Sequence, residues 1–174
     1  MEGTWQLVEV YSTFLRIRGQ IRIMPGARLS DEVNRLERFM TIYNTITEPL
    51  VSSYPVVSPQ EANSTIAKAS VVMVVPEQDA YESNRALWKE KVRHQIVLNT
   101  TAFAMTAEIH LEPKITLGQH IERTANEFLP LTRINAIVVA SLGGTPQTFT
   151  RHFALVNPAS LVSYSVRGAP TGSS

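Results

Sequence analysis

The sequence predicts a mainly β fold of the α+β class, in which two small β-barrel-like units, each with one short helix, are related by a pseudo-twofold duplication. The first observation is a match of the chain with itself at an offset of 88 residues. Identical pairs at that offset, without a gap, include Thr13 and Thr101, Ile21 and Ile109, Pro25 and Pro113, Leu29 and Leu117, and Arg35 and Arg123. The second is that apolar residues alternate along both matched segments, as on the inner face of a half-buried strand. The repeated pattern indicates an internal repeat.

Each copy is expected to contain a strand, a tight turn, a long strand, a short helix, a strand, a loop and a final strand. The long strands should place four apolar side chains in the core: Ile21, Ile23, Ile109 and Leu111. In the first copy, Ser30 can cap the helix while Asp31 and Glu32 complement the helix dipole. In the second copy, Thr116 and Gln119 have the spacing of a capping box.

The offset changes after the helix. An offset of 89 pairs Phe39 with Phe128, and an offset of 82 pairs residues 71–76 (VVMVVP) with residues 153–158 (FALVNP). The difference predicts a longer loop in the first copy. Residues 50–65 are rich in Ser and Pro and are expected to form that loop without regular structure.

These matches predict four segments. The first unit spans residues 5–77, a helical linker spans 78–93, the second unit spans 94–166, and a disordered tail spans 167–174. Trp88 lies among good helix formers and is interpreted as a packing anchor of the linker.

The composition indicates a globular protein, with 44% hydrophobic and 18% charged residues. No apolar run approaches the roughly 20 residues of a membrane span, and the first residues do not resemble a signal peptide, so a cytoplasmic location is expected. The formal net charge of +1 provides no long-range field for nucleic acid or an anionic membrane. The absence of cysteine excludes disulfides, thiol nucleophiles and Cys-ligated zinc.

The second copy contains the segments NEFLPLTRINAIVV and RHFALVNPASLVSYSV. With these segments, residues 94–166 resemble a small bacterial domain family that is labelled only as a domain of unknown function, and residues 6–78 resemble it more weakly. Arg133 replaces an acidic residue of the family pattern. The resemblance implies no activity and no cofactor.

A weaker topological resemblance is to the small barrels of the Sm-like and SH3-like class. It rests on the strand order, on an "L-T" strand followed by a closing "V-N-P" strand, and on Gly19 and Ala107 in mid-strand. A small residue at such a position commonly allows a sharp bend or bulge. The fold resemblance by itself implies no function.

The outward face of the first long strand carries Arg16, Arg18 and Arg22, together with Phe14 and Gln20. Three guanidinium groups and an aromatic ring could hold phosphates and stack a base, which makes this face the candidate nucleic-acid site. The favoured alternative is an exposed strand that is protected against aggregation or paired with acidic residues.

The corresponding strand of the second copy carries Glu108, His110 and Glu112, with His120 on the following helix. These side chains could ligate a divalent metal, although a solvated strand face is the favoured interpretation. The sequence contains no G-x-S-x-G, G-x-G-x-x-G or Walker motif. No catalytic residue, metal site or cofactor is therefore predicted.

The favoured function is a non-enzymatic interaction or scaffold protein, which binds a protein partner or itself through the duplicated unit. The first alternative is an RNA-binding module that uses Phe14, Arg16, Arg18 and Arg22. The second alternative is a metal-dependent enzyme. No membrane partner is expected.

Overall fold

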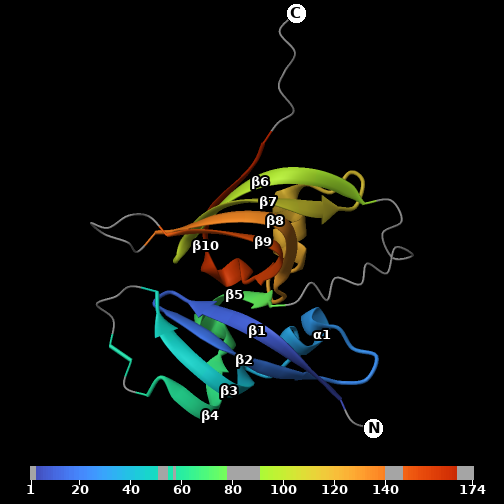
Figure 1. Ribbon diagram of the computed structural model, residues 1–174. Coiled ribbons are helices and arrows are strands. Elements are labelled where there is room, and N and C mark those ends of the chain that lie inside the picture. Colours follow the sequence, from blue (N-terminus) through green and yellow to red (C-terminus); the bar gives the residue numbers. More distant parts are fainter. Residues whose placement is uncertain (1–2, 51–54, 57, 78–90, 140–146, 168–174) are drawn as a thin grey trace, which may run out of the picture.

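The chain forms a mainly β structure, as the sequence predicts. The computed structural model describes residues 3–50, 55–56, 58–77, 91–139 and 147–167. In these ranges, ten strands form one open antiparallel sheet in the order β10-β6-β7-β8-β9-β5-β1-β2-β3-β4 (Figure 1). The N-terminal half supplies one end of this sheet and the C-terminal half supplies the other.

The elements follow one another in a similar order in both halves. The first half contains β1 (Thr4–Ser12), β2 (Leu15–Ile23), α1 (Leu29–Val33), β3 (Phe39–Pro49), β4 (Gln60–Ala67), the 3-10 turn η1 (Lys68–Ser70) and β5 (Val71–Pro76). The second half contains β6 (Val92–Thr100), β7 (Phe103–Leu111), α2 (Leu117–Arg123), β8 (Leu129–Val138), β9 (Thr148–Val156), the 3-10 turn η3 (Pro158–Ser160) and β10 (Leu161–Val166).

The two halves also share their strand registers. Val8 lies opposite Gly19, and Ile96 lies opposite Ala107, which is the predicted offset of 88. Asn44 and Arg133, which differ by 89, have positive φ angles of 51° and 49°. Residues 8–46 and 96–134 therefore have the strand, strand, helix and strand order that the sequence predicts.

The predicted offset of 82 at the end of each half is wrong. Val71 lies opposite Ser12, and Leu161 lies opposite Thr100, so β5 corresponds in position to β10 at an offset of 90. Residues 153–158 instead end β9 and begin η3. One strand of each half, β4 and β10, was therefore missed.

The expected irregular loop is also wrong in its second part, because β4 begins at Gln60. The sequence QEANSTIA of this strand has no apolar alternation, which explains why the sequence pattern does not predict it. Residues 51–54 and 57 of the expected loop lie outside the described residues.

The predicted faces of the long strands are confirmed, because Ile21, Ile23, Ile109 and Leu111 are all buried. At Gly19, an added Cβ would lie 2.6 Å from the Ile42 side chain and 2.7 Å from the Tyr43 carbonyl oxygen. The strand pair shifts register at this point. The glycine thus permits the close approach of β3 where its register with β2 shifts.

The two helices begin differently from one another. Gln119 N–H donates to Thr116 Oγ1 at 3.2 Å and Thr116 N–H donates to Gln119 Oε1 at 3.0 Å, which confirms the predicted capping box of α2. The prediction of Ser30 as the cap of α1 is wrong. The Asp31 carboxylate accepts from the Arg28 N–H at 2.8 Å, so that the helix is capped two residues earlier.

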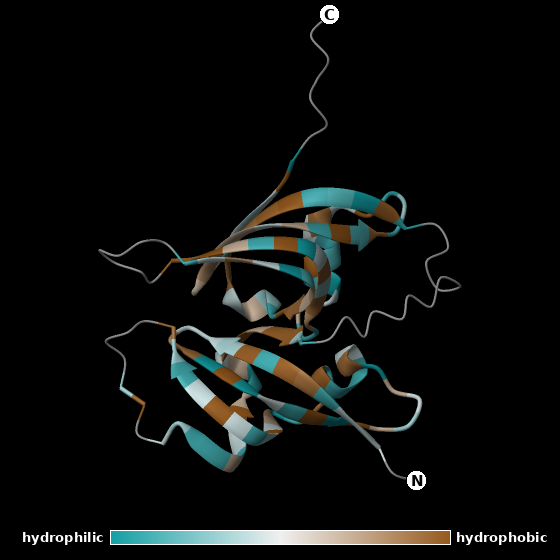
Figure 2. Cartoon of the chain, viewed as in Figure 1, coloured by the Kyte–Doolittle hydropathy of each residue, from teal (hydrophilic) through white to brown (hydrophobic). Residues whose placement is uncertain are grey.

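Two apolar clusters form the core, and each contains residues from both halves. The cluster of the second half includes Tyr11, Val72 and Met73 from the first half. The cluster of the first half includes Phe128 and Leu155 from the second half. Figure 2 shows the corresponding apolar bands along the strands where the halves meet. The two halves therefore bury their apolar surface against each other.

The predicted segment boundaries are met only in part by the described residues. β6 begins at Val92, so the last two residues of the expected linker, 92–93, belong to a strand. Residues 78–90 of the expected linker, including Trp88, and the expected tail beyond residue 167 lie outside the described residues.

Candidate functional site

The candidate site lies at the junction where β5 of the first half pairs with β9 of the second. Met73 lies opposite Val156 and Val74 lies opposite Leu155. The junction continues at Asn157, whose backbone N–H donates to the Val72 carbonyl oxygen at 2.9 Å. Asn157 Nδ2 donates to the carbonyl oxygens of Val71 at 2.8 Å and of Lys68 at 3.1 Å. One side chain thus joins η3 to the start of β5.

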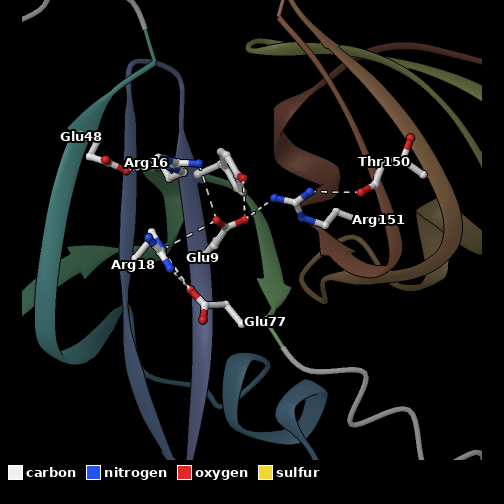
Figure 3. A network of polar contacts seen from close by, with 8 residues as sticks. Glu9, Arg16, Arg18, Glu48, Glu77, Thr150 and Arg151 are labelled. Atoms are coloured by element: carbon white, nitrogen blue, oxygen red, sulfur yellow. Dashed lines mark hydrogen bonds and ion pairs between the residues drawn. The ribbon is translucent and has the colours of Figure 1, made fainter.

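A buried carboxylate, Glu9 on β1, lies at the centre of a polar network at this junction (Figure 3). Arg151 reaches from β9 and its Nη2 donates to Glu9 Oε2 at 2.8 Å. The Tyr11 hydroxyl donates to the same oxygen at 2.7 Å. Arg16 Nη1 lies 3.6 Å and Arg18 Nε 3.9 Å from Glu9 Oε1. Both carboxylate oxygens therefore have cationic or hydrogen-bonding partners.

An aromatic cluster supports this network from both halves. The Tyr11 ring stacks on Phe149 with a centroid distance of 5.5 Å and meets Phe103 edge-on at 5.4 Å. The Arg151 guanidinium lies 5.1 Å from the centre of the Phe149 ring. Such contacts fix the orientation of Tyr11 and Arg151 around the carboxylate.

The protonation states of the network follow from its contacts. Burial raises the pKa of Glu9, but the hydrogen bonds from Arg151 and Tyr11 and the charges of Arg151 and Arg16 outweigh it, so that the pKa is lowered. Burial and the Glu9 charge raise the pKa of Tyr11 to about 12. Glu9 is therefore ionised and Tyr11 protonated at neutral pH, as the ion pair between Glu9 and Arg151 requires.

Two further ion pairs extend the network to the outer strands. Arg16 Nε donates to Glu48 Oε2 at 3.0 Å, and Arg18 Nη2 donates to Glu77 Oε1 at 2.7 Å. Beside them is an open cleft of about 340 Å³. Its lining comes from both halves: Glu9, Arg18, Pro76, Glu77, Thr150, Arg151, His152 and Phe153.

The structure places the predicted nucleic-acid residues in three different environments. Arg16 and Arg18 point outward as expected, but both are in ion pairs with carboxylates. Arg22 is exposed near the other end of β2. Phe14 is exposed in the turn between β1 and β2 and not on the strand face. Two of the three arginines of the predicted face are therefore ion-paired, and Arg22 is exposed.

An exposed aromatic pair near Arg22 was missed by sequence reasoning. Trp5 on β1 lies directly opposite Arg22, and its ring meets Tyr43 of β3 edge-on at 5.0 Å. Trp5 and Tyr43 are 38 residues apart in the sequence, so only the pairing of β1 with β2 and β2 with β3 brings them together.

Glu108, one of the four side chains that were considered as metal ligands and not favoured, has other partners. Glu108 is buried, and its carboxylate accepts from Arg133 Nη1 at 3.3 Å and lies 3.7 Å from Arg93 Nη1. Burial lowers the pKa of both His110 and His120. Within the described ranges, no group of three or more His, Asp or Glu side chains could hold a metal ion.

The two outer strands of the sheet, β4 and β10, are the second candidate surface. Each is hydrogen-bonded to one neighbour only in the described sheet. Val162, Tyr164 and Val166 of β10 are 70%, 45% and 45% exposed. Their counterparts on β5 include Val72 and Val74, which are 2% and 0% exposed. The two β5 side chains are buried because Val72 packs in the apolar cluster of the second half and Val74 in that of the first half.

Comparisons with known proteins assign no role to these sites. No protein-family model matches the chain, and no curated protein or solved structure shows significant similarity to it. None of the helices in the described part of the chain has the length and apolar character to cross a membrane.

Proposed function

We propose that this protein is a non-enzymatic interaction or scaffold protein, built by internal duplication of a β-rich unit. The observation that carries the proposal is the pair of outer strands, β4 and β10, at the two ends of one ten-stranded sheet. An outer strand presents backbone donors and acceptors that can bind another strand. In this proposal, β4 and β10 are the surfaces that bind a partner.

The composition of β10 supports this function. Its alternate residues Val162, Tyr164 and Val166 are apolar and exposed, whereas monomeric proteins usually protect such an edge with charges or proline. The register of β10 shifts between Leu161 and Ser163, but residues 161–166 include no charge and no proline. Aromatic and apolar side chains are also enriched where proteins bind one another. We infer that a partner covers this strand.

The polar junction supports the same function. Its main carboxylate, Glu9, is fully occupied by Arg151 and Tyr11, so the network holds β9 against β1 and β5. In this interpretation the network is a structural element that connects the two duplicated units, and the outer strands do the binding.

The test is affinity capture from native lysate with the tagged full-length chain, in nuclease-treated and untreated samples. Thr65→Pro removes a backbone donor of β4, and Thr65→Ala is the matched control that keeps this donor. The proposal expects protein partners that withstand nuclease and that Thr65→Ala retains but Thr65→Pro loses. Partners that disappear with nuclease, or that Thr65→Pro retains equally, would contradict it.

One observation favours RNA binding as a second candidate. Arg22 is exposed opposite Trp5, and Trp5 contacts Tyr43, so a cation and two aromatic rings lie on one outer face. A mobility shift of labelled single-stranded RNA at low salt tests this candidate. Arg22→Ala should lower the salt slope by about 0.7, and Trp5→Ala should weaken binding. Unchanged RNA mobility at micromolar protein would contradict the candidate.

A further inference from the structure

We propose that the partner of the two outer strands is a second copy of this chain, with β4 of one copy pairing antiparallel with β10 of the next. This inference rests on the proposed function and specifies its partner. The protein already contains one junction of this kind, between β9 and β5. The outer strands would form the same junction between chains.

The registers define which residues would meet. Ile66 of β4 occupies the place of Val156 of β9. Ile66 lies opposite Met40 and Val156 lies opposite Leu129, and Met40 and Leu129 match at the offset of 89. Ser163 of β10 likewise occupies the place of Met73 of β5. Ser163 lies opposite Asn99 and Met73 lies opposite Tyr11, and Tyr11 and Asn99 match at the offset of 88. A repeat of the β5·β9 junction between chains therefore places Ser163 opposite Ile66 and Tyr164 opposite Thr65.

The backbone of β4 has the orientation that this pairing requires. Lys68 N–H donates inward to the Arg38 carbonyl oxygen at 3.0 Å. Because backbone groups alternate along a strand, the N–H groups of Ala67 and Thr65 point to the open edge. Asn157, which occupies the place of Ala67, donates its backbone N–H across the existing junction to Val72. The place of Val72 on the open edge is taken by Val162.

Charges at the open edges are also complementary. In the existing junction, Arg151 of β9 and Glu77 after β5 line the same cleft. At the open edges, Glu61 of β4 occupies the place of Arg151 of β9. Glu61 lies opposite Thr45 and Arg151 lies opposite Ile134, and Thr45 and Ile134 match at the offset of 89. Glu77 and Arg167 also correspond, because their N–H groups donate to Leu7 and Gln95 at 3.0 Å and 2.9 Å. Glu61 on β4 would thus meet Arg167 after β10. In the existing junction the charges are reversed, with the base Arg151 on β9 and the acid Glu77 after β5.

The proposed junction would also cover the apolar surface of β10. Val162, Tyr164 and Val166 would pass from an exposed edge to a strand with a neighbour on each side, the place that the buried Val72 and Val74 occupy on β5. The contact uses two different surfaces, so it is heterologous and continues from chain to chain until it closes into a ring or extends as a filament.

The first experiment blocks each edge separately in the full-length chain. Thr65→Pro removes an outward donor from β4, and Tyr164→Pro does so on β10; Thr65→Ala and Tyr164→Ala are the controls. Native mass spectrometry and light scattering should show assemblies for the unchanged chain and monomers for each proline variant. An equal mixture of the two proline variants should give a one-to-one dimer, because one intact β10 and one intact β4 remain. Circular dichroism confirms that each variant is folded.

The second experiment exchanges charges and does not disturb the backbone. Glu61→Arg or Arg167→Glu alone should weaken assembly by about two- to five-fold in dissociation constant. The double variant, or a mixture of the two single variants, should restore it. An unchanged chain that is monomeric throughout the micromolar range would overturn self-assembly. If the same chain captures a different protein in an edge-dependent manner, the proposed interaction function stands without self-assembly. If the chain neither self-assembles nor captures another protein through its outer strands, the proposed function is contradicted as well.

Discussion

The strands at the junction and the strands at the open ends of the sheet occupy corresponding places but have different sequences. Residues 71–75 of β5 and residues 154–156 of β9 are entirely buried and apolar. Their counterparts on β10 alternate polar and apolar residues, with Ser163 and Ser165 among them, and their counterparts on β4 include the polar residues Ser64 and Thr65. A strand buried on both faces needs a continuous apolar sequence, whereas an outer strand with one polar face tolerates water.

The largest expected difference between the two regions concerns apolar burial. Leu155→Ala should lower the free energy of unfolding by about 2 to 5 kcal/mol, because the side chain is fully buried in the apolar cluster of the first half. Thr65→Ala, at the corresponding place on β4, should change it by about 0.5 kcal/mol or less. Urea denaturation of both variants measures the comparison. Similar losses for the two variants would show that the open edge is as important for folding as the junction.

A smaller difference is expected from the side-chain hydrogen bonds of Asn157. Asn157→Ala should cost about 1 to 3 kcal/mol, because the buried carbonyl oxygen of Val71 and the part-buried carbonyl oxygen of Lys68 lose their Nδ2 donor. Asn157→Asp keeps the acceptor for the Ala159 N–H but not the donors, so it should be destabilising as well. Thermal unfolding at neutral pH measures both variants. If Asn157→Asp has the stability of the unchanged chain, the bond to Ala159 is the important one and the link to β5 is not.

The smallest expected effect is the pH dependence of the Glu9 network. The pKa of Glu9 is lowered in the folded chain from its usual value of 4.5, so its contribution is complete above that pH and is lost as the pH falls through the folded pKa. Glu9→Gln should therefore remove part of the acid dependence of unfolding below pH 4.5. Urea midpoints measured at a series of pH values test this prediction. Parallel curves for the variant and the unchanged chain would exclude Glu9 as an acid-sensitive group.

Much of the fold could be predicted from alternation along the strands. The pattern of Ile21, Ile23, Ile109 and Leu111 identified the inner faces because each strand has one buried and one solvated face. The same method missed β4, whose position at the edge leaves no apolar face for a pattern to show. It also misaligned β5 with residues 153–158, because two strands that are buried on both faces look alike in sequence.

The candidate site was predictable only in fragments. Alternation placed Arg16 and Arg18 on the outer face, but their partners Glu48 and Glu77 come from other strands. The contact between Glu9 and Arg151 spans 142 residues and depends on the pairing of β5 with β9. No local spacing predicts such a contact, whereas the capping box of Thr116 and Gln119 is local and was correctly predicted.

The most direct test of the central claim is amide hydrogen exchange of the full-length chain at several protein concentrations. Self-assembly predicts that the amides of Thr65 and Tyr164 become protected as the concentration rises. The amides of Leu155 and Val74, which pair within one chain, should be protected at every concentration. Rapid exchange of Thr65 and Tyr164 at all concentrations, with Leu155 and Val74 protected, would contradict the claim that the open edges repeat the junction between copies.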